Sequence, residues 1–382
     1  MKILIITQKY GESEVGGRRW YLFSKSLISK GLDVDVHCFI NLTNESDHVI
    51  SFCYRWIHFL WSDNGHFILR LFSKFIRSVF PKLKHRLLRK WMRQIDVRKY
   101  SDYDCVIISV PSFELVELTR QEIFERYSGV LALDCRDPIY LAERYSIPSH
   151  SSVILNVSEK ITLQTQELIG AGSKSTFDTI HNCMKPSNDN YHISAIENSE
   201  RYLIFIGTLY SEIQKRFFEV LDYVITDYNC RNPLKKLRVK LYISLDKSYF
   251  QSKGIEVNTD IFELLNYAEG PEFERNIRMA VAGIIPLWPG RYEGYGTKFL
   301  DYLKFEKNFL VIQDEVWKSE FYEKFKTSTG IQFNDWNKET LGNKLEEILD
   351  SDLSINSNLR DEFSLDFNTQ KLINVIEELR IK

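Results

Sequence analysis

Residues 1–40 read MKILIITQKYGESEVGGRRWYLFSKSLISKGLDVDVHCFI, and this stretch decides the expected fold. Residues 2–7 form an apolar, β-branched run that is typical of a buried strand. A polar segment with three glycines follows at 8–19, and residues 20–31 then carry apolar side chains at helical spacing. Residues 33–40 read as a second buried strand. This order predicts a β-α-β unit with parallel strands.

The rest of the chain continues this alternation of strands and helices. Apolar runs at 104–110 and 129–135 predict further strands, and a second series opens with the run RYLIFIGTL at 201–209. The 382 residues are too many for one ordinary core, because domains usually run about 100–200 residues. We therefore predict an α/β fold with two Rossmann-like, doubly wound domains that face each other across a cleft.

A polar stretch without periodicity marks the expected boundary between the domains. The first domain spans 1–184, the linker 185–200 and the second domain 201–365. The apolar pattern at 366–382 predicts a C-terminal helix, which we expect to pack back towards the first domain. Ligands of doubly wound sheets bind at the carboxyl ends of the strands, where loops meet helix N-termini.

Composition excludes several classes of protein. The chain is 44% apolar and 27% charged, which is globular composition, and its net charge of −2 gives no reason to expect a nucleic-acid partner. Its six cysteines form no C-x-x-C pair, as expected for reduced thiols in a cytosolic protein. No apolar run is long enough for a transmembrane helix. No H-E-x-x-H or Walker motif occurs, and we expect neither a metal nor P-loop chemistry.

The stretch AGIIPLWPGRYEGYGTKFLDYL, residues 282–303, combines a strand, a glycine-rich elbow and a helix start. Thr297 can cap the helix, and the free N–H groups there favour an anion such as phosphate. Glu293 and Asp301 are eight positions apart, about 12 Å at helical rise, which suits an elongated ligand. One carboxylate would bind sugar hydroxyls and the other a ribose diol. The alternative is a glycine turn with two solvated acids.

This elbow resembles glycosyltransferase family four, whose members have the GT-B fold. The segment GTKFLDYLKFEKNFLVI is similar to the family's tKlfEYLa-gKPvv, and LALDCRDP, VSEK, IHN and LIFIGTL occur in the expected order. The resemblance implies that Glu293 contacts the donor sugar and Asp301 the ribose. The backbone that would hold the diphosphate comes from Gly294, Tyr295, Gly296 and Thr297. Asp301 replaces the family's glutamate, and Glu306-Lys307-Asn308 replaces gKP.

Basic residues in the second domain are candidates for the leaving diphosphate. Lys215 and Arg216 follow a loop that opens with Gly207 and Thr208, which we also assign to the donor. The family carries cations at this place, where they would stabilise developing charge. Lys298 could serve the same role. The alternative for all three cations is an ordinary solvated surface.

Gly16, Gly17, Arg18 and Arg19 are expected to form a phosphate or acceptor loop between the first strand and helix. Glycines permit close approach, and arginine side chains can fork onto phosphate. A flexible exposed loop is the alternative.

The strand at 129–135 ends in the charged run Asp134, Arg136 and Asp137. Asp137 could contact an acceptor hydroxyl, or act as a base if the enzyme inverts. Arg136 and His181 are assigned to the acceptor side. The alternatives are an internal Asp–Arg pair and a structural histidine.

Residues 55–100 are basic and aromatic, with twelve Lys or Arg residues against two acids. Such a segment can lie on an anionic membrane surface. The alternatives are a core with a solvated basic face, or a nucleic-acid patch, which the absence of a nucleic-acid motif disfavours.

These features together predict a nucleotide-sugar-dependent glycosyltransferase with a lipid-linked or glycan acceptor, bound peripherally at the cytoplasmic face of the membrane. No cofactor is expected; the UDP- or GDP-linked sugar is a co-substrate. The resemblance further implies retention of configuration, independence of metal, and a role in bacterial surface polysaccharide synthesis. The alternatives are a nucleotide-sugar epimerase of the same architecture and a non-catalytic peripheral membrane protein.

Overall fold

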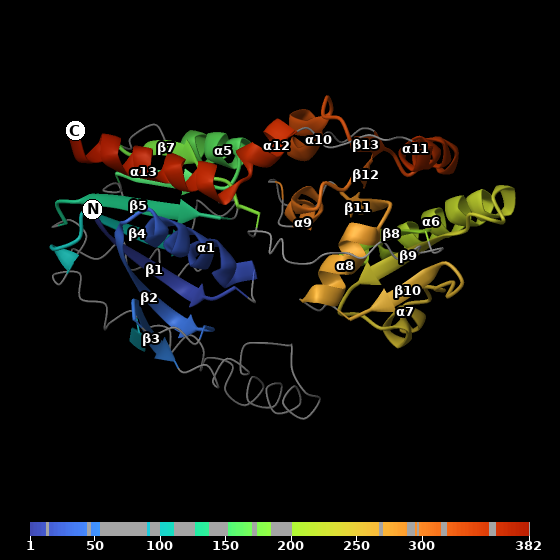
Figure 1. Ribbon diagram of the computed structural model, residues 1–382, viewed down its shortest axis with the longest axis horizontal. Helices are drawn as coiled ribbons and strands as arrows, with labels where there is room; N and C mark the ends of the chain where they lie inside the picture. Colours follow the sequence, from blue (N-terminus) through green and yellow to red (C-terminus); the bar gives the residue numbers. More distant parts are fainter. Residues whose placement is uncertain are drawn as a thin grey trace. The chain divides into compact units, whose positions relative to one another are not determined.

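A computed structural model describes fourteen segments of the chain. They are residues 1–12, 15–43, 47–53, 90–91, 100–110, 127–136, 152–169, 174–184, 201–266, 270–288, 295, 298–314, 319–350 and 357–381. The chain divides into two compact units, Met1–Cys183 with Leu365–Lys382, and Met184–Ser364. Each unit contains one parallel, doubly wound sheet (Figure 1), so the predicted fold class is confirmed.

The sheet of the first unit has the strand order β3-β2-β1-β4-β5-β6-β7, and every described pairing is parallel. Its order reverses between β1 and β4, which makes this the topological switch point. The strands are β1 (Lys2–Tyr10), β2 (Asp33–Asn41), β3 (Val49–Cys53), β4 (Cys105–Val110), β5 (Val130–Cys135), β6 (Val153–Asn156) and β7 (Thr176–Thr179). The helices are α1 (Val15–Ser29), α5 (Glu159–Ile169) and α13 (Leu365–Ile381).

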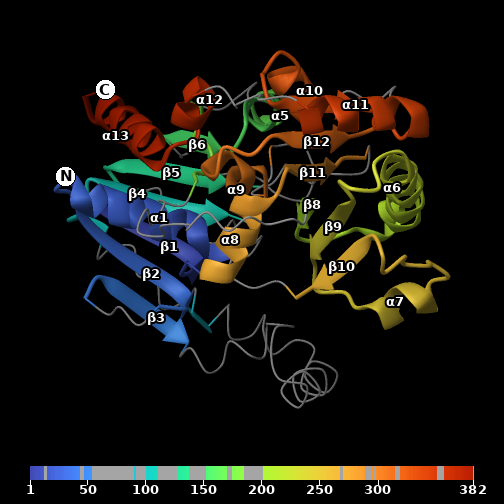
Figure 2. The same cartoon turned by 45° about the vertical axis from the view of Figure 1, so that its right-hand side comes forward.

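Alternation along β1 divides the core of the first unit between the two faces of its sheet. Ile3 and Ile5 face a cluster that contains apolar side chains of α1 and α13, whereas Leu4 and Ile6 belong to a second cluster. Helices α1 and α13 therefore cover the same face, and Figure 2 shows α1 along β1 and α13 beside β5. The last helix of the chain is thus a structural part of the unit formed by the first residues.

The sheet of the second unit has the order β10-β9-β8-β11-β12-β13, with its switch point between β8 and β11. Its strands are β8 (Arg201–Ile206), β9 (Leu237–Tyr242), β10 (Phe262–Leu265), β11 (Ala282–Pro286), β12 (Phe309–Ile312) and β13 (Ile331–Asn334). Its helices are α6 (Ser211–Arg231), α7 (Lys247–Ser252), α8 (Pro271–Met279), α9 (Lys298–Lys304), α10 (Glu320–Phe325), α11 (Lys338–Asp350) and α12 (Ser357–Glu362). Apolar residues of α6, α7 and α11 cover one face, and those of α8, α9 and α10 cover the other.

The structure corrects the prediction of a loop at 8–19. β1 continues to Tyr10, because it pairs with β2 as far as Tyr10 opposite Asn41. Helix α1 begins at Val15, so Gly16, Gly17, Arg18 and Arg19 lie in its first turns instead of a loop. A Cβ on Gly17 would lie 2.9 Å from the N of Gly11, so glycine allows this part of the helix to approach the end of β1 closely. The backbone of residues 16–19 is helical.

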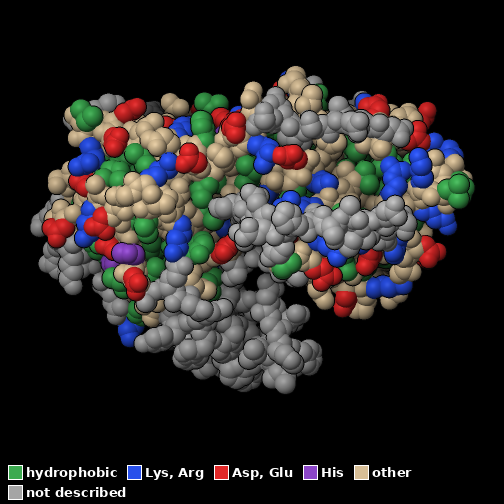
Figure 3. Space-filling view, in the orientation of Figure 1, with side chains coloured by type: hydrophobic (Ala, Val, Ile, Leu, Met, Phe, Trp, Pro, Cys, Tyr) green, Lys and Arg blue, Asp and Glu red, His purple; other side chains and the backbone are tan. Residues whose placement is uncertain are grey.

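Charges are interspersed over the molecular surface. On the face drawn in Figure 3, acidic and basic side chains alternate over the described parts of both units, in keeping with the small net charge. Within the described residues, no helix is both long and apolar enough to span a bilayer. The basic segment 55–100 lies outside the described residues except for positions 90, 91 and 100. Of these, Trp91 is buried and packs near Phe39.

Glu306 is the one described non-glycine residue with a positive φ, at 55°. It follows α9, and the N–H of Lys307 donates to the carbonyl of Tyr302, which closes the end of the helix. Glycine is the usual residue at such a position, and it also stands there in the gKP sequence that this turn resembles. The Glu306 carboxylate instead pairs with Arg360 on α12.

Two substitutions at this turn should differ in stability by about 1 kcal/mol, because alanine resists a left-handed conformation that glycine accepts. Glu306→Ala and Glu306→Gly both remove the ion pair, so their comparison isolates the backbone effect. We expect the glycine variant to have the higher midpoint in urea unfolding. Equal midpoints would contradict a left-handed turn at Glu306.

Candidate functional site

The carboxyl edge of the second sheet opens at its switch point. β8 and β9 pair along their whole length, but β8 and β11 pair only at Leu203 with Ala282 and Ile204 with Gly283. The last residues of β8 and β11 therefore separate before the chain reaches the loops that follow them. A crevice at this place is where ligands of open α/β sheets bind.

Tyr302 of α9 fills the base of this opening. Its side chain is fully buried, and its hydroxyl lies 3.2 Å from the N of Ile206, 3.1 Å from the O of Ile204 and 3.4 Å from the O of Ile284. The hydroxyl accepts from the first and can donate to either carbonyl, so it replaces missing ladder bonds between β8 and β11. Burial raises the pKa of Tyr302, which keeps this donor protonated. The ring of Tyr302 also packs closely over Gly283, because a Cβ added to Gly283 would lie only 2.7 Å from the ring atoms.

Lys298, the first residue of α9, crosses over the end of β8. A Cβ on Gly207 would lie 1.9 Å from Lys298 Cε, so only glycine leaves room for the lysine chain. Gly207 also has φ 117°, which favours glycine. Lys298 Nζ lies 3.4 Å from the carbonyl oxygen of Thr208. The structure thus brings together three of the residues assigned to the donor: Gly207, Thr208 and Lys298.

Asp301 lies in the first turn of α9, one turn after Lys298, and is half-buried. Tyr295 is the one described residue of the elbow. Its ring is buried among Phe299, Phe325 and Phe363, with centroids 5.3–6.1 Å away. Tyr295 therefore anchors the elbow through its side chain and has only its backbone to offer a ligand. The other elbow positions assigned to the donor lie outside the described residues: Glu293, Gly294, Gly296 and Thr297.

The two cations of α6 have different surroundings. The helix begins at Ser211, which places Lys215 in its second turn, where it is 72% exposed and pairs with Glu219 at 3.7 Å. Arg216 instead donates to Asp314, just beyond β12, at 2.7 Å. Its guanidinium also lies 5.3 Å from the ring centroid of Trp336. The structure therefore holds Arg216 at the carboxyl edge of the sheet, whereas Lys215 follows the outside of the helix.

Two aromatic residues at this edge were not among the residues assigned from the sequence. Tyr210 precedes α6 and Trp288 follows β11, and their ring centroids are 4.8 Å apart. Tyr210 is 47% exposed, which is unusual for a large aromatic side chain packed against a buried one. Tyr210 is close in sequence to Gly207, and Trp288 is close to the elbow. This closeness to residues assigned to the donor could have identified both from the sequence. The pair presents an aromatic surface beside the switch point.

At the carboxyl edge of the first sheet, Arg19 and Asp134 form a fully enclosed ion pair. Arg19 Nη2 lies 3.0 Å from Asp134 Oδ1, and the guanidinium also donates to the carbonyls of Ile180 and His181, both at 2.9 Å. The other oxygen of Asp134 accepts from the indole N–H of Trp20 at 2.8 Å. This network joins α1, β5 and the segment after β7. These internal contacts occupy the guanidinium of Arg19, and the residue is only 5% exposed.

The neighbouring candidates on this edge are arranged around the start of α1. Arg136 Nη1 donates to the carbonyl of Gly16 at 2.6 Å, and Arg18 Nε donates to the carbonyl of Glu12 at 3.0 Å. Arg136 thus fixes the beginning of the helix. Gly17 is buried in the same turn. Asp137 lies outside the described residues.

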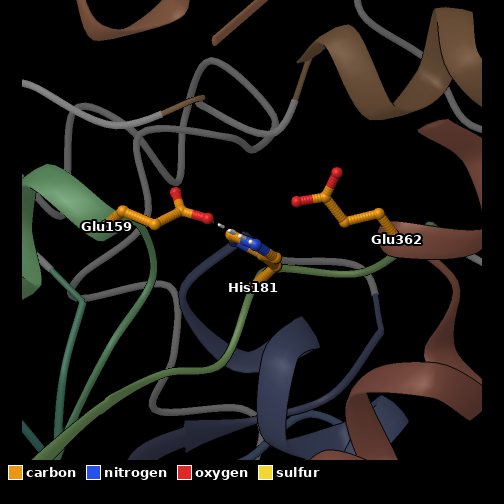
Figure 4. Close-up of side chains that lie close together, drawn as sticks. All are labelled: Glu159, His181 and Glu362. Carbon is orange, nitrogen blue, oxygen red and sulfur yellow. Dashed lines mark ion pairs between the residues drawn. The ribbon is translucent and has the colours of Figure 1, made fainter.

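His181 is buried and follows β7. Its side chain faces that of Glu159 (Figure 4). Its Nδ1 lies 3.1 Å from the carbonyl oxygen of Val157, and its Nε2 lies 3.4 Å from a carboxylate oxygen of Glu159, at the start of α5. The backbone N–H of His181 donates to Asn368 of α13 at 3.0 Å. These contacts link the segment after β7 to α5 and α13 through His181.

Comparison with known proteins places this architecture among GT-B structures. No protein-family model matches the chain, and neither does any curated protein. A UDP-forming trehalose-phosphate synthase from Burkholderia vietnamiensis is similar in structure, with a TM-score of 0.63, 10% identity and 99% of both chains covered. A UDP-GlcNAc 2-epimerase from Methanocaldococcus jannaschii has a TM-score of 0.55 and 10% identity, with 99% of this chain and 100% of that chain covered. At this identity the likeness shows the fold, and the GT-B fold expected from the sequence is confirmed.

Proposed function

We propose that the chain is a nucleotide-sugar-dependent glycosyltransferase similar to family four. The observation that carries this proposal is the arrangement of Lys298 over Gly207 and Thr208 at the switch point of the second sheet. A cation and a glycine without a side chain, beside the opening between two strands, suit a diphosphate. Solved structures with this fold include both sugar-transferring and sugar-epimerising enzymes.

The donor in this proposal lies along the carboxyl edge of the second unit. Lys298 and Arg216 neutralise its phosphates, and Asp301 accepts hydrogen bonds from the ribose. Glu293 contacts the sugar, while the backbone at 294–297 supplies N–H groups to the diphosphate. Lys215 is proposed to stabilise charge on the leaving diphosphate; in the structure it pairs with Glu219 on the outside of α6.

The acceptor in this proposal is bound by the first unit. The strand ends and the start of α1 supply Arg136, Asp137 and the backbone of Gly16 and Gly17. We propose a lipid-linked or glycan acceptor, with residues 55–100 attracted to the anionic inner face of the membrane. Retention of configuration without a metal follows from the resemblance to family four. The pathway would then be the synthesis of a bacterial surface polysaccharide.

An assay with full-length protein and a panel of nucleotide sugars tests the activity. The panel is incubated with and without a membrane extract that contains lipid-linked glycans, and products are separated by anion-exchange chromatography. We expect acceptor-dependent release of a nucleoside diphosphate and incorporation of the sugar into the glycan. Formation of an epimer without any acceptor would instead identify the alternative, a nucleotide-sugar epimerase, which several structures with this fold exemplify.

Replacing Lys298 by methionine should weaken binding of the nucleoside diphosphate product roughly 10- to 100-fold, the usual effect of losing one charge-assisted hydrogen bond. Isothermal titration of the full chain measures this constant. Lys235→Met, at an exposed lysine of the same unit, is the matched control and should bind as the wild type does. Equal affinity of all three proteins would remove Lys298 from the donor site.

A further inference from the structure

The aromatic pair at the carboxyl edge of the second sheet has one buried and one exposed member. The ring centroids of Tyr210 and Trp288 are 4.8 Å apart, with 45° between the ring planes. Trp288 is 9% exposed and belongs to the apolar cluster on the face that α6 covers, whereas Tyr210 is 47% exposed. Contact with a buried indole therefore supports a tyrosine ring that remains half exposed.

Tyr210 also occupies a helix position to which tyrosine is poorly suited. It is the N-cap residue of α6, and its side chain makes no capping hydrogen bond. N-caps favour Ser, Thr, Asp and Asn, whose short side chains accept a hydrogen bond from the free N–H groups of the first turn. The stability of α6 therefore does not explain a tyrosine here. Departures from such local rules are expected at functional sites.

The backbone that carries the Tyr210 ring is fixed by hydrogen bonds from α6. The amide of Gln214, which is 3% exposed, donates to the carbonyl of Leu209 at 2.8 Å. The N–H of Ile213 donates to the carbonyl of Tyr210 at 3.2 Å. A ring on a fixed backbone loses little freedom when a ligand binds, which favours its use as a contact surface.

Lys298 would bring the phosphates of the proposed donor to the same loop. The lysine starts from α9, but its Nζ reaches to 5.6 Å from the ring centroid of Phe205, a member of the cluster on the α6 face. The same Nζ lies 3.4 Å from the carbonyl oxygen of Thr208, two residues before Tyr210. A diphosphate bound to this ammonium therefore lies beside the loop that carries the exposed ring.

The order of parts in a nucleotide sugar then indicates which part meets Tyr210. The diphosphate joins the nucleoside to the sugar, so these two groups leave it in different directions. In the proposed donor site, Asp301 binds the ribose from α9, whose apolar residues cover the other face of the sheet. Tyr210 and Trp288 approach from the α6 side. Trp288 also leads into the elbow with Glu293, which is assigned to the sugar.

We propose, on the basis of the proposed function, that Tyr210 stacks against the C–H face of the donor sugar, with Trp288 supporting its ring. The C–H groups of a pyranose carry a small positive charge, and the face of an aromatic ring is negative, so the two attract each other. The sugar class that this contact selects is a pyranose with an unbroken C–H face. The nucleoside and its phosphates are bound elsewhere in the site.

Isothermal titration of full-length protein tests this contact, with UDP-glucose, UDP-N-acetylglucosamine and GDP-mannose as probes, each compared with UDP or GDP. We expect Tyr210→Ala to bind the preferred nucleotide sugar roughly 10-fold more weakly than the wild type, the usual effect of losing one aromatic contact. Its affinity for the matching diphosphate should stay within about twofold, because the phosphates and the nucleoside do not touch the ring. Tyr210→Phe keeps the ring and should bind both as the wild type does.

Two further variants separate this contact from a structural role. Tyr210→Ser supplies a capping hydroxyl, so it should unfold at a higher temperature than Tyr210→Ala and still lose the binding contributed by the sugar. Tyr223→Ala removes another exposed tyrosine, on α6 itself, and should bind every probe as the wild type does.

The outcomes distinguish this proposal from the proposed function. If the wild type binds none of the nucleotides, the proposed function fails and the sugar contact fails with it. If the diphosphates bind and Tyr210→Ala keeps the wild-type affinity for the nucleotide sugar, only the contact is overturned. An equal loss of affinity for the sugar-linked and the free diphosphate would also overturn it, because the ring would then contact the nucleoside diphosphate.

Discussion

Glu293→Gln is expected to reduce the rate of sugar transfer roughly 10²- to 10³-fold, the usual effect of removing one group that stabilises the transition state electrostatically. In the proposed site the Glu293 carboxylate binds the donor sugar as its bond to the diphosphate breaks. Glutamine keeps the size and the hydrogen-bonding oxygen but removes the charge. The measurement is steady-state transfer with the nucleotide sugar that the wild type converts, and kcat should fall much more than KM rises.

Glu256→Gln is the matched control for this substitution. Glu256 is an exposed glutamate of the same unit, so its amide variant should transfer sugar at the wild-type rate. Binding of the nucleoside diphosphate should also survive in Glu293→Gln, because the phosphates are held by other groups. Unchanged kcat in Glu293→Gln would refute the role assigned to the elbow.

Arg19→Met should destabilise the first unit by about 3–5 kcal/mol, because it leaves the buried Asp134 carboxylate without its counter-ion. The carbonyls of Ile180 and His181 would lose donors at the same time. The apparent midpoint of thermal unfolding should fall by about 10 °C. The double variant Arg19→Met/Asp134→Leu should recover part of this loss, because it removes both buried charges.

Arg231→Met is the control for the buried pair, since Arg231 likewise forms ion pairs, with Asp227 and Glu346, but is half exposed. Surface ion pairs contribute little, so its midpoint should stay near that of the wild type. A small effect of Arg19→Met, comparable with that of Arg231→Met, would mean that the Arg19–Asp134 pair is not enclosed as described.

Continuous apolar runs made the buried strands, and through them the fold, predictable. Ile3 and Ile5 face one cluster and Leu4 and Ile6 the other, so the continuous apolar run correctly indicated a strand buried on both faces. The helix start was harder to place. Gly16 and Gly17 are poor helix formers, and their presence favoured a loop, but α1 includes both, and Gly17 packs closely against the backbone of Gly11.

The geometry of the site depended on contacts that a sequence does not display. Arg19 and Asp134 are 115 positions apart, and only the folded sheet brings them together. Lys215 and Lys298 both looked like cations near a helix start. The difference between them arises because α6 begins four residues before Lys215, whereas Lys298 fits over a glycine at the end of β8.

The position of the Tyr302 hydroxyl could not be predicted from the sequence either. Tyr302 belongs to the apolar pattern of α9, and its side chain is fully buried. The pattern does not show that the hydroxyl lies between the ends of β8 and β11. That contact joins the helix that carries Asp301 to the strand that precedes Gly207. It thereby fixes the two sides of the proposed donor site to each other.

Thermal unfolding of the full-length chain with UDP, GDP, CMP and dTDP tests the central claim most directly, because a ligand that binds only the folded state raises its stability. We predict that one diphosphate raises the midpoint by several degrees, that the matching nucleoside without phosphates does not, and that Lys298→Met loses most of the increase. If none of the nucleotides changes the midpoint of the wild type, the chain does not bind a nucleotide-linked donor, and the second unit does not contain the proposed donor site.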